Sequence, residues 1–192
     1  MEIKNILNNM NLDNKIELNE MPEIDLYMDQ VIQLFESKLS SLKRNDEEKI
    51  LTKTMINNYA KGKLLLPIKN KKYTKEHLII MAFIYNLKGA LSINDIKISL
   101  DEITENYSEE KSNDLRELYS CYLEENMNDI KNFKSNVEQK IENIQSRDSK
   151  LECMEKDYEE KFLLLCSLVN MSNLYRRASE KLIDELFSKN NH

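Results

Sequence analysis

Glycine and proline, the two residues that interrupt helices most strongly, are almost absent from this chain. Only 2 Gly and 2 Pro occur in 192 residues, at Pro22, Gly62, Pro67 and Gly89. Because proline breaks a helix interior and glycine weakens it, the spans between these positions can run as uninterrupted helix. The high content of leucine, isoleucine, lysine, glutamate and asparagine, with no tryptophan, fits the same class. We therefore predict an all-α protein.

The spacing of apolar residues predicts four helices in the first hundred residues. Steps of three and four indicate helices over residues 26–42, 52–61, 75–88 and 93–100. Thr52 or Thr54 can cap the second of these, and Thr74 the third, because a hydroxyl accepts from the open amides of a first turn. Gly62 suits the left-handed position that ends many helices.

A small β-wing is expected between the second and third helices. Residues 64–66 and Pro67 read as an extended piece, Asn70–Lys71 as a turn, and Lys72–Tyr73 as a short return strand. The predicted order is therefore helix, helix, wing, helix and short helix.

The second half of the chain predicts two long helices. Apolar residues recur at steps of three and four over 112–146 and again over 151–187, with a turn at 147–150 and a kink near 170–173. A helix of ~35 residues is ~50 Å long, too long to bury its seam on a small domain alone. Residues 162–169 are apolar nearly all round and should be covered on more than one side. A dimer contact and a four-helix-like core within one chain both remain open.

Charge is distributed unevenly along the chain. The protein is acidic, with a formal net charge of −6, yet residues 49–100 carry 10 basic and 2 acidic residues. Between Lys49 and Lys75 there is no acidic residue and there are eight lysines. A basic segment in an acidic protein is typical of binding to a polyanion, because neutralised phosphates release counterions. The alternative is a solvated helix face without acidic residues.

Other functional classes find little support in the sequence. The three cysteines, Cys121, Cys153 and Cys166, lack paired spacing and read as buried or half-buried thiols in a reducing cytoplasm. No apolar run approaches the ~20 residues of a membrane span. His77 and His192 have no second histidine nearby, and no nucleophile motif or phosphate-binding glycine loop occurs. We therefore expect no catalytic residues, no metal site, no cofactor and no membrane partner, and place the protein in the cytoplasm.

The basic segment resembles the DNA-binding head of MerR-type regulators. In that family a threonine begins the recognition helix, an aromatic residue ends it, and a Gly/Leu/Leu/Pro turn leads into a basic wing. Thr54, Tyr59, Gly62, Leu64, Leu65 and Pro67 occupy those places here, and Lys72-Tyr73-Thr74 ends the wing. The resemblance covers roughly residues 50–100, and it implies a winged helix-turn-helix.

Over its whole length the chain also resembles the YkrK-like group of Firmicute proteins of unknown function. The similar pieces are residues 22–30, 51–59, 71–77 and 170–177. This resemblance implies a cytoplasmic protein and a transcription regulator, without established chemistry.

These observations predict a double-stranded DNA site. Asn57 and Asn58 can each offer a bidentate amide suited to adenine, while the lysines would contact phosphates. The predicted DNA-binding residues are Thr52, Lys53, Thr54, Asn57, Asn58, Tyr59, Lys61, Lys63, Lys69, Lys71, Lys72 and Tyr73. Tyr59 and Tyr73 can equally be core rings. Arg176 and Arg177 form a basic spot that either binds an anionic effector or pairs with neighbouring acids.

Three regions follow from this interpretation. Residues 1–21 are expected to form a flexible arm, residues 22–103 the MerR-like DNA-binding domain, and residues 104–192 a helical region that forms a homodimer or senses an unknown effector. The main alternative is a helical adaptor that binds another protein and has no specific DNA site. An RNA-binding regulator and an enzyme are weaker alternatives.

Overall fold

The structure, a computed structural model, describes residues 2–105, 107, 112–148 and 155–187. Its elements in chain order are α1 (Glu2–Asn9), η1 (Leu18–Glu20), β1 (Leu26–Tyr27), α2 (Met28–Leu39), η2 (Ser40–Leu42), α3 (Lys53–Lys61), β2 (Lys72–Tyr73), α4 (Lys75–Leu87), α5 (Ile93–Glu105), α6 (Ser112–Gln145), α7 (Lys156–Leu182) and η4 (Ile183–Phe187). The predicted all-α class is confirmed, because the β structure of the described part is limited to a sheet of two strands with two residues each and an isolated bridge between Lys69 and Lys72.

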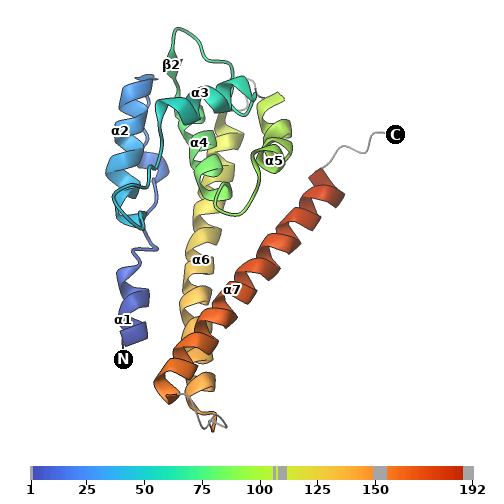
Figure 1. Ribbon diagram of the computed structural model, residues 1–192. Helices are drawn as coiled ribbons and strands as arrows, with labels where there is room; N and C mark the ends of the chain where they lie inside the picture. The colour runs from blue at the N-terminus through green and yellow to red at the C-terminus, as the bar shows by residue number, and fades with distance from the viewer. Residues whose placement is uncertain (1, 106, 108–111, 149–154, 188–192) are drawn as a thin grey trace.

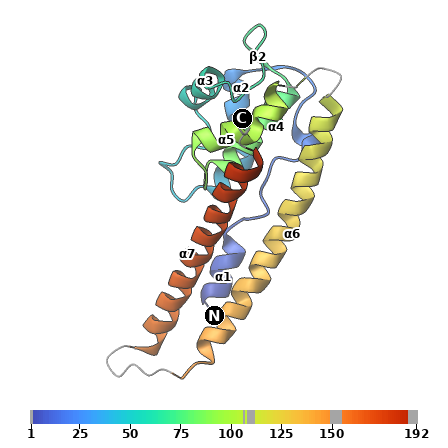
Figure 2. The same ribbon diagram turned by 90° about the vertical axis from the view of Figure 1, so that its right-hand side faces the viewer.

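The molecule has a helical head and a long helical hairpin (Figure 1). The head holds α2 to α5 together with the first turns of α6, and α6 then runs away from it. Helix α7 returns at an angle to α6 and ends beside α5 (Figures 1 and 2). The main core lies in the head, around α4, and α6 adds Leu115, Tyr119 and Leu123 to it.

Most predicted helices are present with shifted ends. The helix expected over 26–42 begins two residues later, because Leu26–Tyr27 forms a strand, and its last turn is the 3₁₀ helix η2. Helix α5 continues to Glu105, five residues beyond the predicted end. The kink expected near 170–173 is absent, since α7 is continuous over Lys156–Leu182 and changes to a π-helical turn only at Ile183. Residues 149–154, which include the second half of the turn predicted at 147–150, lie outside the described residues.

The wing differs from the predicted one in the partner of its strand. Strand β2 pairs antiparallel with β1, so that Leu26 faces Tyr73 and Tyr27 faces Lys72. The residues expected to form the outgoing strand, Leu64–Leu66, are instead buried in the core. The turn at Asn70–Lys71 is present: both residues have positive φ, 54° and 57°, and the Lys72 N–H donates to the Lys69 carbonyl at 3.0 Å. Positive φ at both central residues defines the type I′ hairpin turn.

Helix α3 ends in a way that the sequence did not predict. Gly62 has an ordinary helical φ of −73°, and the left-handed residue is Lys63, with a φ of 59°. The Leu64 N–H donates to the Tyr59 carbonyl at 2.9 Å and the Lys63 N–H to the Ala60 carbonyl at 3.1 Å, the two bonds of a Schellman motif. A Cβ on residue 62 would lie 2.7 Å from Leu64 Cδ1, so any larger residue there would require the buried Leu64 side chain to shift.

The N-terminal segment contacts the rest of the molecule at several points. Ile16 and Met21 belong to the main core, and the Tyr119 hydroxyl donates to the Ile16 carbonyl at 2.7 Å. Leu7 of α1 packs in a second small cluster with Val137, Ile141 and Leu164. The flexible arm over residues 1–21 stays a prediction about motion, while these contacts place the segment along α6.

The hairpin of α6 and α7 buries only part of its apolar surface. Two clusters cover the ends of the α6 seam, but Met127 and Phe133 between them are exposed. Along α7 only Leu164 is buried. Cys121 and Cys166 are exposed, which corrects the prediction of buried thiols, because the faces that carry them point away from both clusters. Cys153 lies outside the described residues.

Lys63→Gly should stabilise the fold by about 1 kcal/mol, because a left-handed φ costs a lysine about that much more than a glycine. Lys61→Gly is the matched control. It removes the same charge from the last helical residue of α3, where glycine should cost up to ~1 kcal/mol. Urea unfolding followed by circular dichroism measures both values. Equal losses of stability in the two variants would contradict the left-handed assignment.

Candidate nucleic-acid interface

Helix α3 presents one polar face to solvent. Thr52 caps it, with its hydroxyl accepting from the Met55 N–H at 3.1 Å. Ile56 and Tyr59 turn into the core. The side chains left on the outer face are Lys53, Thr54, Asn57, Asn58 and Lys61. This face therefore carries two amides between cationic residues, and no large apolar side chain interrupts it.

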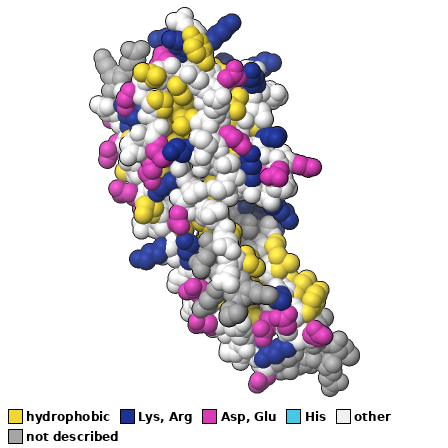
Figure 3. Space-filling model, turned by 90° about the vertical axis from the view of Figure 1, so that its left-hand side faces the viewer, with side chains coloured by type: hydrophobic (Ala, Val, Ile, Leu, Met, Phe, Trp, Pro, Cys, Tyr) yellow, Lys and Arg dark blue, Asp and Glu magenta, His cyan; other side chains and the backbone are white. Residues whose placement is uncertain are grey.

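The wing lies at the same end of the molecule as α3 (Figure 1). Its hairpin tip, Lys69 to Lys72, projects beyond the head, and Lys63 follows α3 directly. The Lys72 ammonium lies 5.6 Å from the centre of the exposed Tyr27 ring on the neighbouring strand. Figure 3 shows Lys and Arg side chains at this upper end, with some acidic side chains among them.

Not every lysine of the basic segment contributes to this surface. The Lys75 side chain is buried, and its ammonium pairs with Glu23 at 2.6 Å. Lys53 pairs with Asp29 of α2 at 2.7 Å, but both side chains are largely exposed. An exposed pair of this kind contributes little energy and can exchange partners readily. The cationic surface therefore rests on the exposed lysines of α3 and of the wing.

His77 fastens the wing to α4. The Thr74 N–H donates to His77 Nδ1 at 3.1 Å, which makes Nδ1 an acceptor and leaves the proton on Nε2. Nε2 lies 3.2 Å from the Leu66 carbonyl and donates to it. Burial lowers the pKa of His77, although the bond to Leu66 opposes that change. The neutral ring thus joins both ends of the wing, at Leu66 and Thr74.

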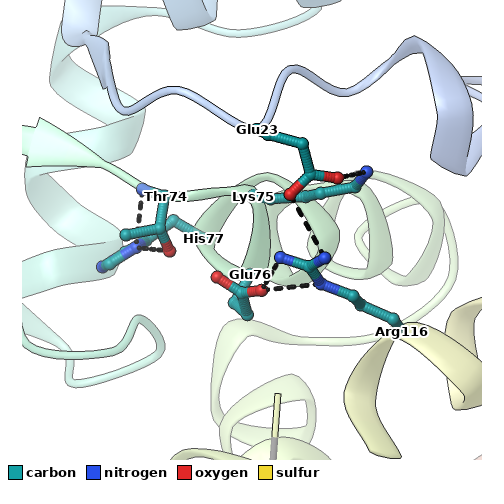
Figure 4. Close-up of polar contacts among 6 residues, drawn as sticks. All are labelled: Glu23, Thr74, Lys75, Glu76, His77 and Arg116. Atoms are coloured by element: carbon teal, nitrogen blue, oxygen red, sulfur yellow. Dashed lines mark hydrogen bonds and ion pairs between the residues drawn. The ribbon is translucent and has the colours of Figure 1, made fainter. Parts of the chain in front are cut away.

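An ion-pair network anchors the start of α4 to α6 and to the N-terminal segment (Figure 4). Arg116 of α6 donates from Nε and Nη2 to Glu76 Oε1 at 2.9 and 2.7 Å, and its Nη1 lies 3.2 Å from Glu23. Burial raises the pKa of Glu76, but the hydrogen bonds from Arg116, from the backbone of Glu76 and from Thr74, together with the charge of Arg116, outweigh it, and the net pKa is lowered. Glu76 is therefore held as a carboxylate although it is 5% exposed.

The structure brings most of the predicted contact residues together and removes two from the surface. Tyr59 and Tyr73 are 5% and 3% exposed, and burial raises the pKa of each phenol. They belong to the core because both rings lie on the inward side of their elements, so they support the surface from below. The other predicted residues lie on α3, directly before or after it, or on the wing.

Sequence reasoning missed the residues that hold this surface in place. His77 follows the cap Thr74 by three residues, the spacing of a capping box, and that spacing was a usable signal. No local signal could have paired Arg116 with Glu76, because the two residues lie 40 positions apart.

Within the described residues, no group of three or more histidine, cysteine, aspartate or glutamate side chains is placed to hold a metal ion. No helix in the same part of the chain has both the length and the apolar character to cross a membrane.

The fold and the surface together define a helical domain with a polar-faced helix beside a basic β-turn. The chain belongs to the family described as a domain of unknown function, DUF1836, whose model matches residues 16–122. That match starts at the buried Ile16 and ends at Tyr122 of α6, so it includes the whole head. No curated protein and no solved structure matches the chain.

His77→Gln should remove part of the pH dependence of stability. The unfolded histidine titrates near pH 6.5 and the folded one lower, so protons bind the unfolded chain first as pH falls. The wild type should therefore lose stability below pH 6.5, by up to about 1.4 kcal/mol per pH unit from this residue. Urea unfolding from pH 7.5 to 5 measures it, with His192→Gln as control. Parallel curves for wild type and His77→Gln would show that the folded pKa is not lowered.

Proposed function

We propose that the protein is a cytoplasmic, sequence-specific DNA-binding regulator of transcription, with α2 and α3 as a helix-turn-helix. Helix α3 would lie in the major groove and the wing on the adjacent backbone. The observation that carries this proposal is the exposed face of α3. It places Asn57 and Asn58 side by side, with Lys53 and Lys61 at its two ends.

The chemistry of this face suits a duplex. On adenine, N7 accepts a hydrogen bond and the neighbouring N6 amine donates one. An asparagine amide matches this edge in one arrangement only, with its N–H donating to N7 and its carbonyl accepting from N6. Lysines supply phosphate contacts, which fix the register of a helix in the groove without reading sequence. The wing tip carries Lys69, Lys71 and Lys72 beyond the head, where the backbone of a docked duplex would pass.

The backbone of the two basic loops supports the same proposal. Lys63 and Lys71 both have a left-handed φ, which glycine adopts at lower cost. Strained backbone conformations are concentrated at functional sites, where the function of the side chain outweighs the loss of folding stability. Two lysines in this conformation, at the two loops that flank the exposed α3 face, are consistent with selection for cationic side chains there.

The proposal also rests on the two resemblances. The MerR-like pattern over residues 50–100 places a recognition helix and a wing at α3 and at residues 62–74, and the YkrK-like resemblance suggests a regulator. The DUF1836 family supplies no chemistry of its own. The buried Tyr59 and Tyr73 are retained in the proposal only as supports of α3 and the wing.

A homodimer would complete such a regulator. Tyr158, Phe162, Leu165 and Val169 are spaced by four, three and four along α7 and are each at least half exposed; we call them the outer stripe. Figure 3 shows hydrophobic side chains on the lower part of the molecule, which α6 and α7 form. Pairing of two outer stripes about an axis along the helices would turn both α3 helices toward one palindromic site.

An adaptor that binds another protein is the second candidate. One observation favours it: nine apolar side chains of α7 and η4 are at least 46% exposed, more than the outer stripe accounts for. Exposed apolar side chains commonly mark a binding site for protein where they form one surface. In that case DNA binding would be weak and independent of sequence.

The test is binding to a duplex from the upstream region of the protein's own gene and to random DNA, over a salt series. Wild type should bind the first more tightly and lose affinity steeply with salt. Lys71→Glu with Lys72→Glu should weaken binding to both duplexes and flatten the salt slope by about two counterions. Lys131→Glu with Lys181→Glu, which makes the same charge change on α6 and α7, should leave both unchanged.

Asn57→Ala separates sequence reading from general affinity in the same assay. It should cost about 1–3 kcal/mol on the specific duplex and much less on random DNA. Asn132→Ala, an exposed asparagine of α6, is the control. Equal losses on the two duplexes would make Asn57 a backbone contact, and no selective binding by wild type would favour the adaptor.

The homodimer has a separate test by analytical ultracentrifugation without DNA. Wild type should sediment with twice the 22.8 kDa chain mass, and Phe162→Glu should be monomeric, because a charge in the outer stripe would be desolvated. Tyr175→Glu places the same charge on another exposed position of α7 and should remain dimeric. Wild type that is still monomeric at about 100 µM, a protein concentration near the dissociation constant of a weak complex, would exclude the pairing.

A further inference from the structure

A small cavity lies in the head between the N-terminal segment, α2, α4 and α6. Its volume is about 170 Å³. Apolar side chains, among them Leu39, Ala82 and Leu123, form part of its wall. The rest of the wall consists of Lys15 and of aromatic and amide side chains, from Asn14, Tyr85, Asn86, Tyr119, Tyr122 and Asn126.

The volume restricts what this cavity can hold. The space is a pocket partly open to solvent, because Asn14 and Asn86 of its wall are exposed, so water fills it when no ligand is bound. Cavities of about 150 Å³ accept benzene, whereas drug-sized ligands need about 300 Å³ or more. One six-membered ring therefore fits, and a fused or substituted ring system does not.

Several polar groups in the wall are free to bind such a ring. In the described part of the chain, no other residue is hydrogen-bonded to the Tyr122 hydroxyl or the Asn126 amide, and both groups reach solvent, because no buried side-chain nitrogen or oxygen there lacks a partner. Burial raises the pKa of Tyr122 to about 12, so its hydroxyl remains a neutral donor and acceptor. Asn86 donates to the Ala82 carbonyl at 2.9 Å, which leaves its own side-chain carbonyl available.

Other groups in the wall are already engaged. The Tyr119 hydroxyl donates to the Ile16 carbonyl, and the Asn14 amide donates to Ser41. Lys15 is the one charged side chain among the described residues of the wall, and it pairs with Glu17 at 3.3 Å. An anionic or cationic ligand would thus find no free counter-charge and would lose its hydration.

We propose that this cavity binds a small uncharged six-membered ring whose edge carries an N–H donor next to a carbonyl acceptor, as in a lactam. The ring would pack against Tyr119 and Tyr122, whose own rings stack at 5.8 Å. Its polar edge would meet the Tyr122 hydroxyl and the Asn126 amide. Both amide and hydroxyl can donate and accept, so they match such an edge in either orientation.

The position of the cavity gives binding a structural consequence. The N-terminal segment, α4 and α6 meet there, and a ligand would add contacts to all three at once. The segment around Ile16 would then be held more firmly against α6. This inference does not depend on DNA binding, because none of the residues in the wall belongs to α3 or the wing.

The experiment titrates 2-pyridone, a neutral single-ring lactam, into the full chain without DNA. Side-chain amide signals of Asn86 and Asn126 in heteronuclear NMR spectra report binding, and thermal unfolding reports the stabilisation that any native-state ligand produces. Benzene tests ring size without polar groups, and benzoate tests charge. We expect 2-pyridone to shift both amides saturably, benzene to bind at least tenfold more weakly, and benzoate not to bind.

Two variants locate the site. Tyr122→Phe keeps the ring and removes the hydroxyl, and should weaken 2-pyridone binding by about tenfold, the value of one buried hydrogen bond. Tyr175→Phe makes the same change on the exposed surface of α7, outside the outer stripe, and should bind as wild type. Ala82→Leu should fill the cavity and abolish binding. If this variant does not fold, the binding affinity of Tyr122→Phe alone tests the location of the site.

Three outcomes would overturn the proposal. The first is no saturable shift with 2-pyridone, which would leave water as the occupant of the cavity. The second is equal binding of benzene or benzoate, which would remove the polar edge from recognition. The third is unchanged binding in Tyr122→Phe, which would place the ligand elsewhere. Failure of the protein to bind DNA in the earlier assay would change none of these three conclusions.

Discussion

The burial of α4 is the constraint on which the rest of the structure depends. Leu78, Ile79, Ile80, Met81, Ala82 and Ile84 are each at most 3% exposed, so this helix is covered on nearly all sides. Its first turn carries Lys75, Glu76 and His77 into the same environment. A buried charge or ring nitrogen costs free energy unless it is paired, so each of the three needs a partner from another segment.

Those partners set the position of the candidate interface. Lys75 pairs with Glu23, Glu76 pairs with Arg116, and His77 hydrogen-bonds to the Leu66 carbonyl. The first two bonds fix the N-terminal segment and α6 on α4, and the third fixes the base of the wing. The exposed face of α3 and the wing tip therefore project from a scaffold whose polar bonds are internal, which suits a surface that must keep its shape on binding.

The helical hairpin of α6 and α7 buries its apolar side chains less completely than the head does. Its seam is buried at both ends but open in the middle, and α7 offers apolar side chains on more than one side. One neighbouring helix can cover only part of the apolar surface of a helix with that distribution. The head thus buries most of its apolar side chains within one chain, whereas much of the apolar surface of α7 is exposed.

The sequence by itself determined the elements that depend on neighbouring residues. Apolar spacing located the helices, Thr52 and Thr74 located two caps, and Asn70–Lys71 located the turn, because each of these preferences acts over a few residues. The lysines and Asn57 of the candidate site were also readable in this way. Only the tertiary structure decided that Leu26–Tyr27 pairs with Lys72–Tyr73, that Lys63 rather than Gly62 takes the left-handed conformation, and that Arg116 neutralises Glu76. The strand pairing and the bond between Arg116 and Glu76 depend on contacts between segments far apart in the chain, and local preference carries no information about which distant side chain will fill a given place. The left-handed Lys63 accompanies the burial of Leu64 in the core, which residue preferences alone did not show.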